Sequence, residues 1–188
     1  MNTKLSITSM IYIALMAVII TICSWISIPG PVPFTLQTFA VFTALLLLGT
    51  RDGLISITVY LLLGAVGVPV FSGFSGGIGH LLGPTGGYLI GFIVMGFVFG
   101  IVRHLIKHPL ASAITASILG LAACYAFGTV WFVIVYSQTK SAITFGAALS
   151  LCVIPFIIPD AIKMALAIIL SARVRSLINR NKLYRYLP

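Results

Sequence analysis

Acidic residues are almost absent from this chain of 188 residues. Asp52 and Asp160 are the two that occur, and charged residues of both signs make up 7% of the sequence. Soluble domains carry about 25% charged residues, so this composition excludes a soluble protein. With 60% hydrophobic residues and a mean hydropathy of +1.19, the sequence predicts an integral membrane protein.

The shortage of acids also limits the chemistry that the chain can perform. Two acids and three histidines offer no metal-ligand spacing, and no serine or cysteine has a base and an orienting residue beside it. Neither Gly-Lys-Ser nor Gly-Lys-Thr occurs, so the Walker A pattern that binds nucleotide phosphates is missing. We therefore expect neither an enzyme nor an ATPase, and no cofactor.

Cysteine is scarce as well. Cys23, Cys124 and Cys152 lie isolated in apolar stretches, which is typical of small buried side chains and not of a disulfide framework or a metal site. The net charge of +9 comes from lysines and arginines at the ends of apolar segments. Bases in such positions indicate membrane topology, so nucleic acid is not an expected partner.

The apolar segments predict an all-α membrane protein with six transmembrane helices in one domain, residues 1–188. At about 20 residues per crossing, we expect spans at 5–28, 38–49, 54–66, 88–103, 111–136 and 159–173. The second and third spans are short and are joined by a tight turn at 49–53. Residues 144–158 are apolar but too short and too rich in proline for a crossing, and they predict a half-helix near one membrane face.

Three segments, 29–37, 67–87 and 137–158, are too rich in proline or glycine for continuous helices. The first is expected to be a stiff extended loop, because each proline also biases its predecessor away from the α region. Irregular backbone at membrane depth must be buried in protein or line a cavity. We therefore expect these segments to converge on a site.

Basic residues predict which side of the membrane this site faces. On the side of the irregular segments only Lys140 occurs, whereas the other side carries Lys4, Arg51, Arg103, Lys107, Arg173, Arg175, Arg180, Lys182 and Arg185. The positive-inside rule then places both termini in the cytoplasm and the irregular segments outside.

Asp160 and Lys163 lie in a segment that otherwise belongs in lipid. Each charge at mid-membrane costs about 3 kcal/mol, so their helix must turn them toward protein or a wet cavity. Three residues apart, they share one helix face. The helix is expected to begin at Pro159, which places Asp160 in the first turn, near the positive end of the helix dipole. The pair either binds a polar ligand or is an intramembrane ion pair that only locks helices together.

A ligand-binding pair would suit a ureido or amide-like head group, because Asp160 accepts from N–H groups and Lys163 donates to a carbonyl. Gln37 offers a further donor and acceptor near the proline loop. Alternatively, Gln37 forms a hydrogen bond between helices and does not contact a ligand.

Residues 83–88, Gly-Pro-Thr-Gly-Gly-Tyr, are a candidate for the anionic end of a ligand. Glycines such as Gly86 allow close backbone approach, and the helix start that follows offers free N–H groups; the alternative is a plain tight turn. Trp25, Phe34 and Tyr88 are candidates for apolar walls, or else aromatic anchors at the membrane interface.

Three patches occur in a fixed order along the chain: Pro31-Val-Pro-Phe-Thr-Leu-Gln-Thr-Phe-Ala40, Gly83-Pro-Thr-Gly-Gly-Tyr-Leu-Ile-Gly91 and Pro159-Asp-Ala-Ile-Lys163. Together they resemble the BioY family, the biotin-binding S components of energy-coupling factor (ECF) transporters. The resemblance covers essentially the whole chain. It implies a multi-pass protein of the bacterial cell membrane that captures biotin from outside with high affinity.

The resemblance also implies partners: a transmembrane coupling subunit and two cytoplasmic ATPases, in agreement with the missing Walker A pattern. It puts the ureido group near Asp160 and Lys163, with Gln37 and Tyr88 close by. Three other functions remain open at this point. They are an autonomous ion-coupled transporter with Asp160 as the protonatable group, an S component for another vitamin, and a membrane scaffold without a ligand.

Overall fold

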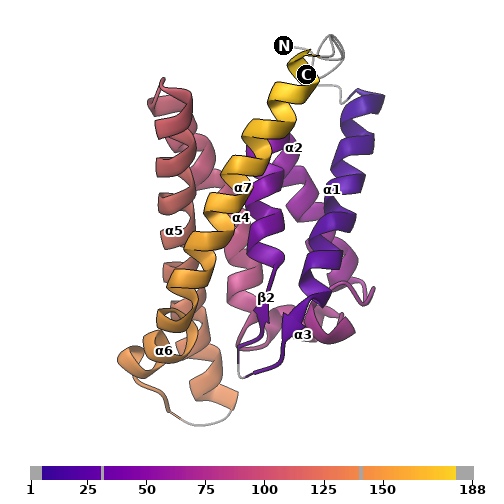
Figure 1. Ribbon diagram of the computed structural model, residues 1–188. Coiled ribbons are helices and arrows are strands. Elements are labelled where there is room, and N and C mark those ends of the chain that lie inside the picture. Colours follow the sequence, from indigo (N-terminus) through magenta and orange to yellow (C-terminus); the bar gives the residue numbers. More distant parts are fainter. Residues whose placement is uncertain (1–5, 31, 140–141, 181–188) are drawn as a thin grey trace.

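Long helices run side by side along one axis, and short irregular elements close one end of the bundle (Figure 1). The computed structural model describes residues 6–30, 32–139 and 142–180. Within these residues, five helices are long and apolar enough to cross a membrane: α1 (Ile7–Trp25), α2 (Gln37–Ala65), α4 (Gly86–Leu105), α5 (Pro109–Thr139) and α7 (Ile154–Arg180). The predicted all-α membrane fold is confirmed.

Helix α2 is a hairpin that makes two passes. Gly49 interrupts it with φ 84° and ψ 176°, a conformation that a residue with a side chain rarely adopts. Beyond it the chain turns back, and the two arms pack closely: a Cβ on Gly53 would lie 3.0 Å from the carbonyl oxygen of Ala44. At the far end, Gln37 Nε2 donates to Tyr60 Oη at 2.8 Å. The two short spans are therefore confirmed, but the turn predicted at 49–53 is confined to Gly49, because residues 50–53 are helical.

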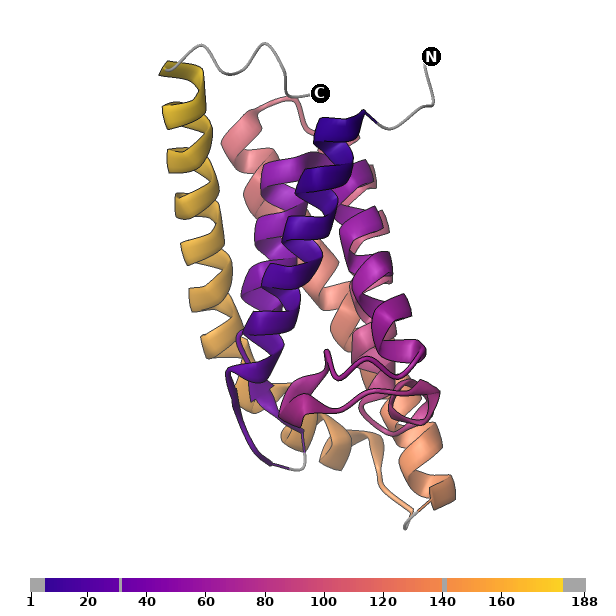
Figure 2. The ribbon, with the colours of Figure 1, turned by 90° about the vertical axis from the view of Figure 1, so that its right-hand side faces the viewer.

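The short elements are β1 (Ser27–Ile28), β2 (Phe34–Thr35), the 3₁₀ turn η1 (Ser72–Phe74), α3 (Ile78–Leu82) and α6 (Phe145–Cys152). The two strands pair antiparallel, Ser27 with Thr35 and Ile28 with Phe34. The segment expected to be an extended loop therefore belongs to a β-hairpin. Figure 2 shows these elements at the end of the bundle opposite the start of α1 and the end of α7. The predicted convergence of the irregular segments is confirmed.

The start of α7 differs from the prediction. The helix begins at Ile154 and not at Pro159, which lies inside it. The backbone N–H groups of Phe156 and Ile157 both donate to the Val153 carbonyl, and Pro155 occupies the first turn, where a missing N–H costs nothing. Pro159 then removes a single hydrogen bond early in the helix. Asp160 consequently lies in the second turn, and the proposed stabilisation by the helix N-terminus does not apply.

The half-helix expected at 144–158 is shorter than predicted. It is α6, which the Thr144 side chain caps by accepting from Ala147 N at 3.3 Å. Residues 154–158 belong to α7 instead.

Helix α7 buries polar side chains and exposes apolar ones. Its buried residues include Asp160, Lys163, Ala167 and Ser171, whose spacing of three and four residues forms one stripe along the helix. Its large exposed hydrophobic residues are isoleucines and leucines: Ile154, Ile157, Ile158, Ile162, Leu166, Ile169, Leu170 and Leu177. This arrangement is the one that lipid favours, since the charged face turns to the bundle.

Candidate ligand-binding site

A cavity lies where the three irregular segments meet the helices. It comprises about 710 Å³ of space between protein atoms, a volume that includes its opening to solvent. Its walls come from 32–38, 71–92, 121–125 and 152–163. Apolar side chains, among them Leu89, Phe92, Leu121 and Phe156, form much of the lining.

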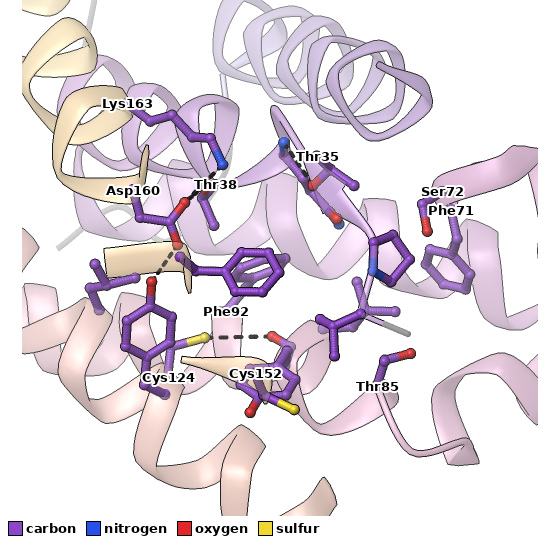
Figure 3. A pocket seen from close by; sticks show the side chains of 18 of the residues that line it. Thr35, Thr38, Phe71, Ser72, Thr85, Phe92, Cys124, Cys152, Asp160 and Lys163 are labelled. Atoms are coloured by element: carbon purple, nitrogen blue, oxygen red, sulfur yellow. Dashed lines mark hydrogen bonds and ion pairs between the residues drawn. The ribbon is translucent and has the colours of Figure 1, made fainter. Parts of the chain in front are cut away.

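Asp160 connects three helices at one side of this cavity (Figure 3). Its carboxylate accepts hydrogen bonds from Thr38 Oγ1 of α2 at 2.8 Å, Tyr125 Oη of α5 at 2.5 Å and Lys163 Nζ at 2.8 Å. The residue exposes 1% of its surface. A buried charge requires such compensation, because an unpaired carboxylate would lose its hydration without replacement.

Lys163 can still form further hydrogen bonds, whereas Asp160 has used most of its acceptor positions. Its ammonium has three N–H groups, and among the described residues Asp160 is the single partner that accepts a hydrogen bond from it. Nζ also lies 4.2 Å from the centre of the Phe34 ring, a cation–π contact. The chemistry that remains is donation to an acceptor in the cavity, such as a ligand carbonyl.

Gln37 and Tyr88 line the same cavity. Gln37 is the first residue of α2, and its amide donates to Tyr60, so it makes the helix-to-helix bond considered above while keeping its carbonyl oxygen as an acceptor. Tyr88 Oη lies 3.0 Å from Thr129 Oγ1. A Cβ on Gly128 would come within 2.2 Å of the Tyr88 ring, so the position of Tyr88 depends on that glycine.

Three other predicted residues are not among those that line the cavity. Phe34 contacts the Lys163 ammonium with its ring face and stacks on Phe156, with the two ring centres 6.0 Å apart. Gly86 supports the fold, because a Cβ there would lie 1.8 Å from the Leu81 carbonyl oxygen. Trp25 donates from Nε1 to Pro69 O at 2.9 Å and is 37% exposed, as expected of an interface anchor.

Sequence reasoning missed several residues of the cavity. Tyr125 and Thr38 bind Asp160, and His80 lines the cavity beside Phe71. One signal was present for Tyr125, because a hydroxyl in the middle of an apolar span needs a buried partner. Thr38 and His80 gave no such signal, since they are ordinary residues near the ends of helices.

Outside the spans, burial changes two titratable groups of the lining. It lowers the pKa of His80 and raises the pKa of the Cys152 thiol, because a charge loses hydration in both cases. Both side chains are thereby held neutral near pH 7. The site as a whole combines one internally paired acid and base with neutral polar groups and apolar walls, which suits a small, mostly uncharged ligand.

Known proteins are similar to this chain in sequence and in fold. A chain called "Probable biotin transporter BioY" from Pyrococcus horikoshii is 41% identical over 174 residues, covering 87% of this chain and 93% of the relative. "Biotin transporter BioY" from Thermotoga maritima is 38% identical over 160 residues, covering 85% and 90%. The crystal structure of the S-component for biotin from an ECF-type ABC transporter matches with a TM-score of 0.79 at 28% identity, covering 94% of this chain and 95% of that chain.

The likeness extends over nearly the whole chain and includes the segments that carry the cavity. A model of the BioY family matches residues 1–180, a range that contains β2, α4 and the Asp160–Lys163 pair. A transporter component agrees with the prediction that the chain is not an enzyme. The chain belongs to the BioY family.

Proposed function

We propose that this chain is the biotin-binding S component of an ECF transporter. The observation that carries the proposal is the buried Asp160–Lys163 pair in the wall of a cavity at the irregular end of the bundle, in a chain of the BioY family. Biotin combines a ureido ring, an apolar thioether ring and a carboxylated tail. The cavity offers polar partners for the ureido ring and apolar walls for the thioether ring.

In this proposal Lys163 donates to the ureido carbonyl, and Asp160 both holds Lys163 in place and accepts from a ureido N–H. Gln37 and Tyr88 contact the polar ring system as well, and Phe34 keeps the ammonium oriented. Gly86 and Trp25 contribute indirectly, by holding the loops that surround the ligand. The apolar thioether ring packs against the lining residues Leu89, Phe92 and Phe156.

The proposal includes the membrane orientation and the partners. Both termini lie in the cytoplasm and the cavity opens outward, because the basic residues gather at the opposite end of the bundle. A transmembrane coupling subunit and two cytoplasmic ATPases supply the energy, since this chain has no nucleotide-binding pattern. The site is in a bacterial cell membrane.

Asp160 is poorly suited to carry protons as an independent ion-coupled transporter would require. Its carboxylate already binds three donors, one of them a lysine, so most of its acceptor positions are occupied by the protein itself. Binding without transport by the isolated chain would distinguish an S component from such a transporter.

The test is a calorimetric titration of the purified chain in detergent with biotin, thiamine and riboflavin, each in a separate experiment. We expect saturable binding of biotin with one site per chain and no binding of the other two vitamins. Saturable binding of thiamine or riboflavin instead would identify another vitamin as the substrate. Absence of any binding would leave the chain as a scaffold.

A further inference from the structure

The cavity has a second polar side, away from Asp160 and Lys163. Figure 3 shows Phe71, Ser72 and Thr85 there, with the charged pair on the other side. His80 belongs to this second side, because its ring lies 5.1 Å from the Phe71 ring in a stacked arrangement. It also lines the cavity. A ligand that reaches both sides therefore meets His80 at the end distant from the charged pair.

The hydrogen bonds of Ser75 determine how the His80 ring is protonated. Ser75 Oγ donates its single hydrogen to the Ser72 carbonyl at 2.7 Å, so it can only accept from His80 Nδ1, which lies 3.2 Å away. Nδ1 therefore carries a hydrogen in the neutral ring as well as in the charged one. Among the described residues, the hydrogen bond that the His80 ring makes is at Nδ1, and none is made at Nε2. It is the nitrogen that remains for a ligand.

The charges of the lining leave an anionic ligand without a free counter-charge. The charged residues among those that line the cavity are Asp160 and Lys163, and they pair with each other. Tyr88 of α4, Tyr125 and Cys124 of α5 and Cys152 of α6 also line it, but phenols and thiols ordinarily titrate above about pH 8. Histidine is the side chain that changes charge near neutrality.

We propose that His80 binds the anionic end of the ligand through Nε2 as an imidazolium, so that ligand binding is accompanied by uptake of a proton at this residue. Thr85 also lines the cavity and precedes the first residue of α4, and the positive end of that helix favours an anion there. The inference rests on the proposed function for the identity of the ligand, biotin, whose carboxylate is its anionic end.

The sign of the pH dependence follows from linkage. Burial lowers the pKa of His80 in the empty cavity, whereas a nearby carboxylate raises it. Between these two values the complex holds a proton that the empty protein lacks, so affinity rises as the pH falls, by at most about tenfold per pH unit. The ligand carboxyl, with an ordinary pKa of about 4.3, stays ionised across this range.

The test compares biotin with its neutral methyl ester between about pH 6 and pH 8, the range in which histidine titrates. Calorimetry of the purified chain gives the affinity, and repetition in two buffers of different ionisation enthalpy gives the proton uptake. For biotin we expect a rise of about five- to tenfold as the pH falls, with uptake of a fraction of a proton. The methyl ester should show neither effect.

Two variants assign the effect to a residue. His80→Gln should abolish the pH dependence of biotin binding, while His104→Gln, which changes an exposed histidine at the other end of α4, should retain it. A pH dependence that survives His80→Gln would assign it to the Asp160–Lys163 pair and overturn the inference, as would an affinity for biotin that is constant or falls with falling pH. Failure of biotin to bind at any pH would instead contradict the proposed function.

Discussion

At the scale of single residues, Asp160 and Lys163 differ in what they can still bind. A carboxylate has about four acceptor positions, and Thr38, Tyr125 and Lys163 occupy three of them. Lys163 has used one of its three N–H groups. In the proposed site Lys163 is thus the main donor to the ligand, and Asp160 fixes the ammonium and keeps the pair neutral in sum.

Removal of one member of the pair should damage both folding and binding. Asp160→Asn and Lys163→Met each leave the other charge buried without its partner, which costs about 3–5 kcal/mol. We expect each variant to bind biotin at least about 100-fold more weakly and to unfold at a lower temperature. Asp52→Asn is the matched control, because this other buried acid lies beyond Gly49, at the opposite end of the α2 hairpin, where it accepts from Ser9. It should leave biotin affinity within about threefold.

The double variant Asp160→Asn/Lys163→Met separates the two possible roles of the pair. Neutral residues of similar size remove both charges together, and such replacements are often neutral or stabilising. We expect the unfolding temperature to recover while biotin binding stays lost. If the double variant binds biotin with near-native affinity, the pair is only a structural lock.

At the scale of the elements, the α2 hairpin positions one wall of the site. It places Gln37 and Thr38 beside the cavity at one end and turns at Gly49 at the other. Arg175 of α7 stabilises this turn, because its Nη2 donates to the carbonyls of Leu46 at 2.6 Å and Leu47 at 3.3 Å. These carbonyls lie in the last turn of the first arm, where a helix leaves carbonyl groups without partners further along the chain. The pair α2 and α7 is therefore connected at both ends, by Thr38–Asp160 and by Arg175.

The backbone conformation of Gly49 predicts a loss of stability when a side chain is introduced there. Gly49→Ala should destabilise the protein by about 1–3 kcal/mol, because a side chain is placed in a backbone region that is essentially restricted to glycine. Gly146→Ala is the control: Gly146 lies in α6, its backbone is helical, and a Cβ there meets nothing within 4 Å. Thermal unfolding in detergent should show a clear decrease for Gly49→Ala and no decrease for Gly146→Ala. Equal unfolding temperatures would show that the turn can relax around a side chain.

At the scale of the whole molecule, the two ends of the bundle have different roles. The irregular end carries the cavity, and the other end carries the turn of α2 and most of the basic residues described, such as Arg51, Arg103 and Arg175. This asymmetry supports an outward-facing site above a cytoplasmic surface that meets the proposed partners. Ligand capture and energy coupling would then occur on opposite faces of the membrane.

Labelling of single cysteines tests this orientation. In a chain whose three native cysteines are replaced, Gly30→Cys marks an exposed position shortly after β1, at the irregular end, and His104→Cys marks the last turn of α4 at the opposite end. A membrane-impermeant maleimide added to intact cells should label the first and not the second. Labelling of His104→Cys alone would reverse the proposed orientation.

The sequence by itself determined the class of the protein, its passes and the inward direction of Asp160 and Lys163. These features depend on the cost of exposing charge or irregular backbone to lipid, and that cost can be assessed from local composition. Composition also predicted that the proline- and glycine-rich segments gather at one end.

Only the tertiary structure decided which other residues meet the pair. Tyr125 is 35 residues and Thr38 is 122 residues from Asp160, so their contacts depend on how α2 and α5 pack and not on any local pattern. The same packing brings His80 into the cavity lining and leaves Trp25 bound to the Pro69 carbonyl outside it. Even the start of α7 was decided in this way, because two prolines offered possible first turns and either was locally acceptable.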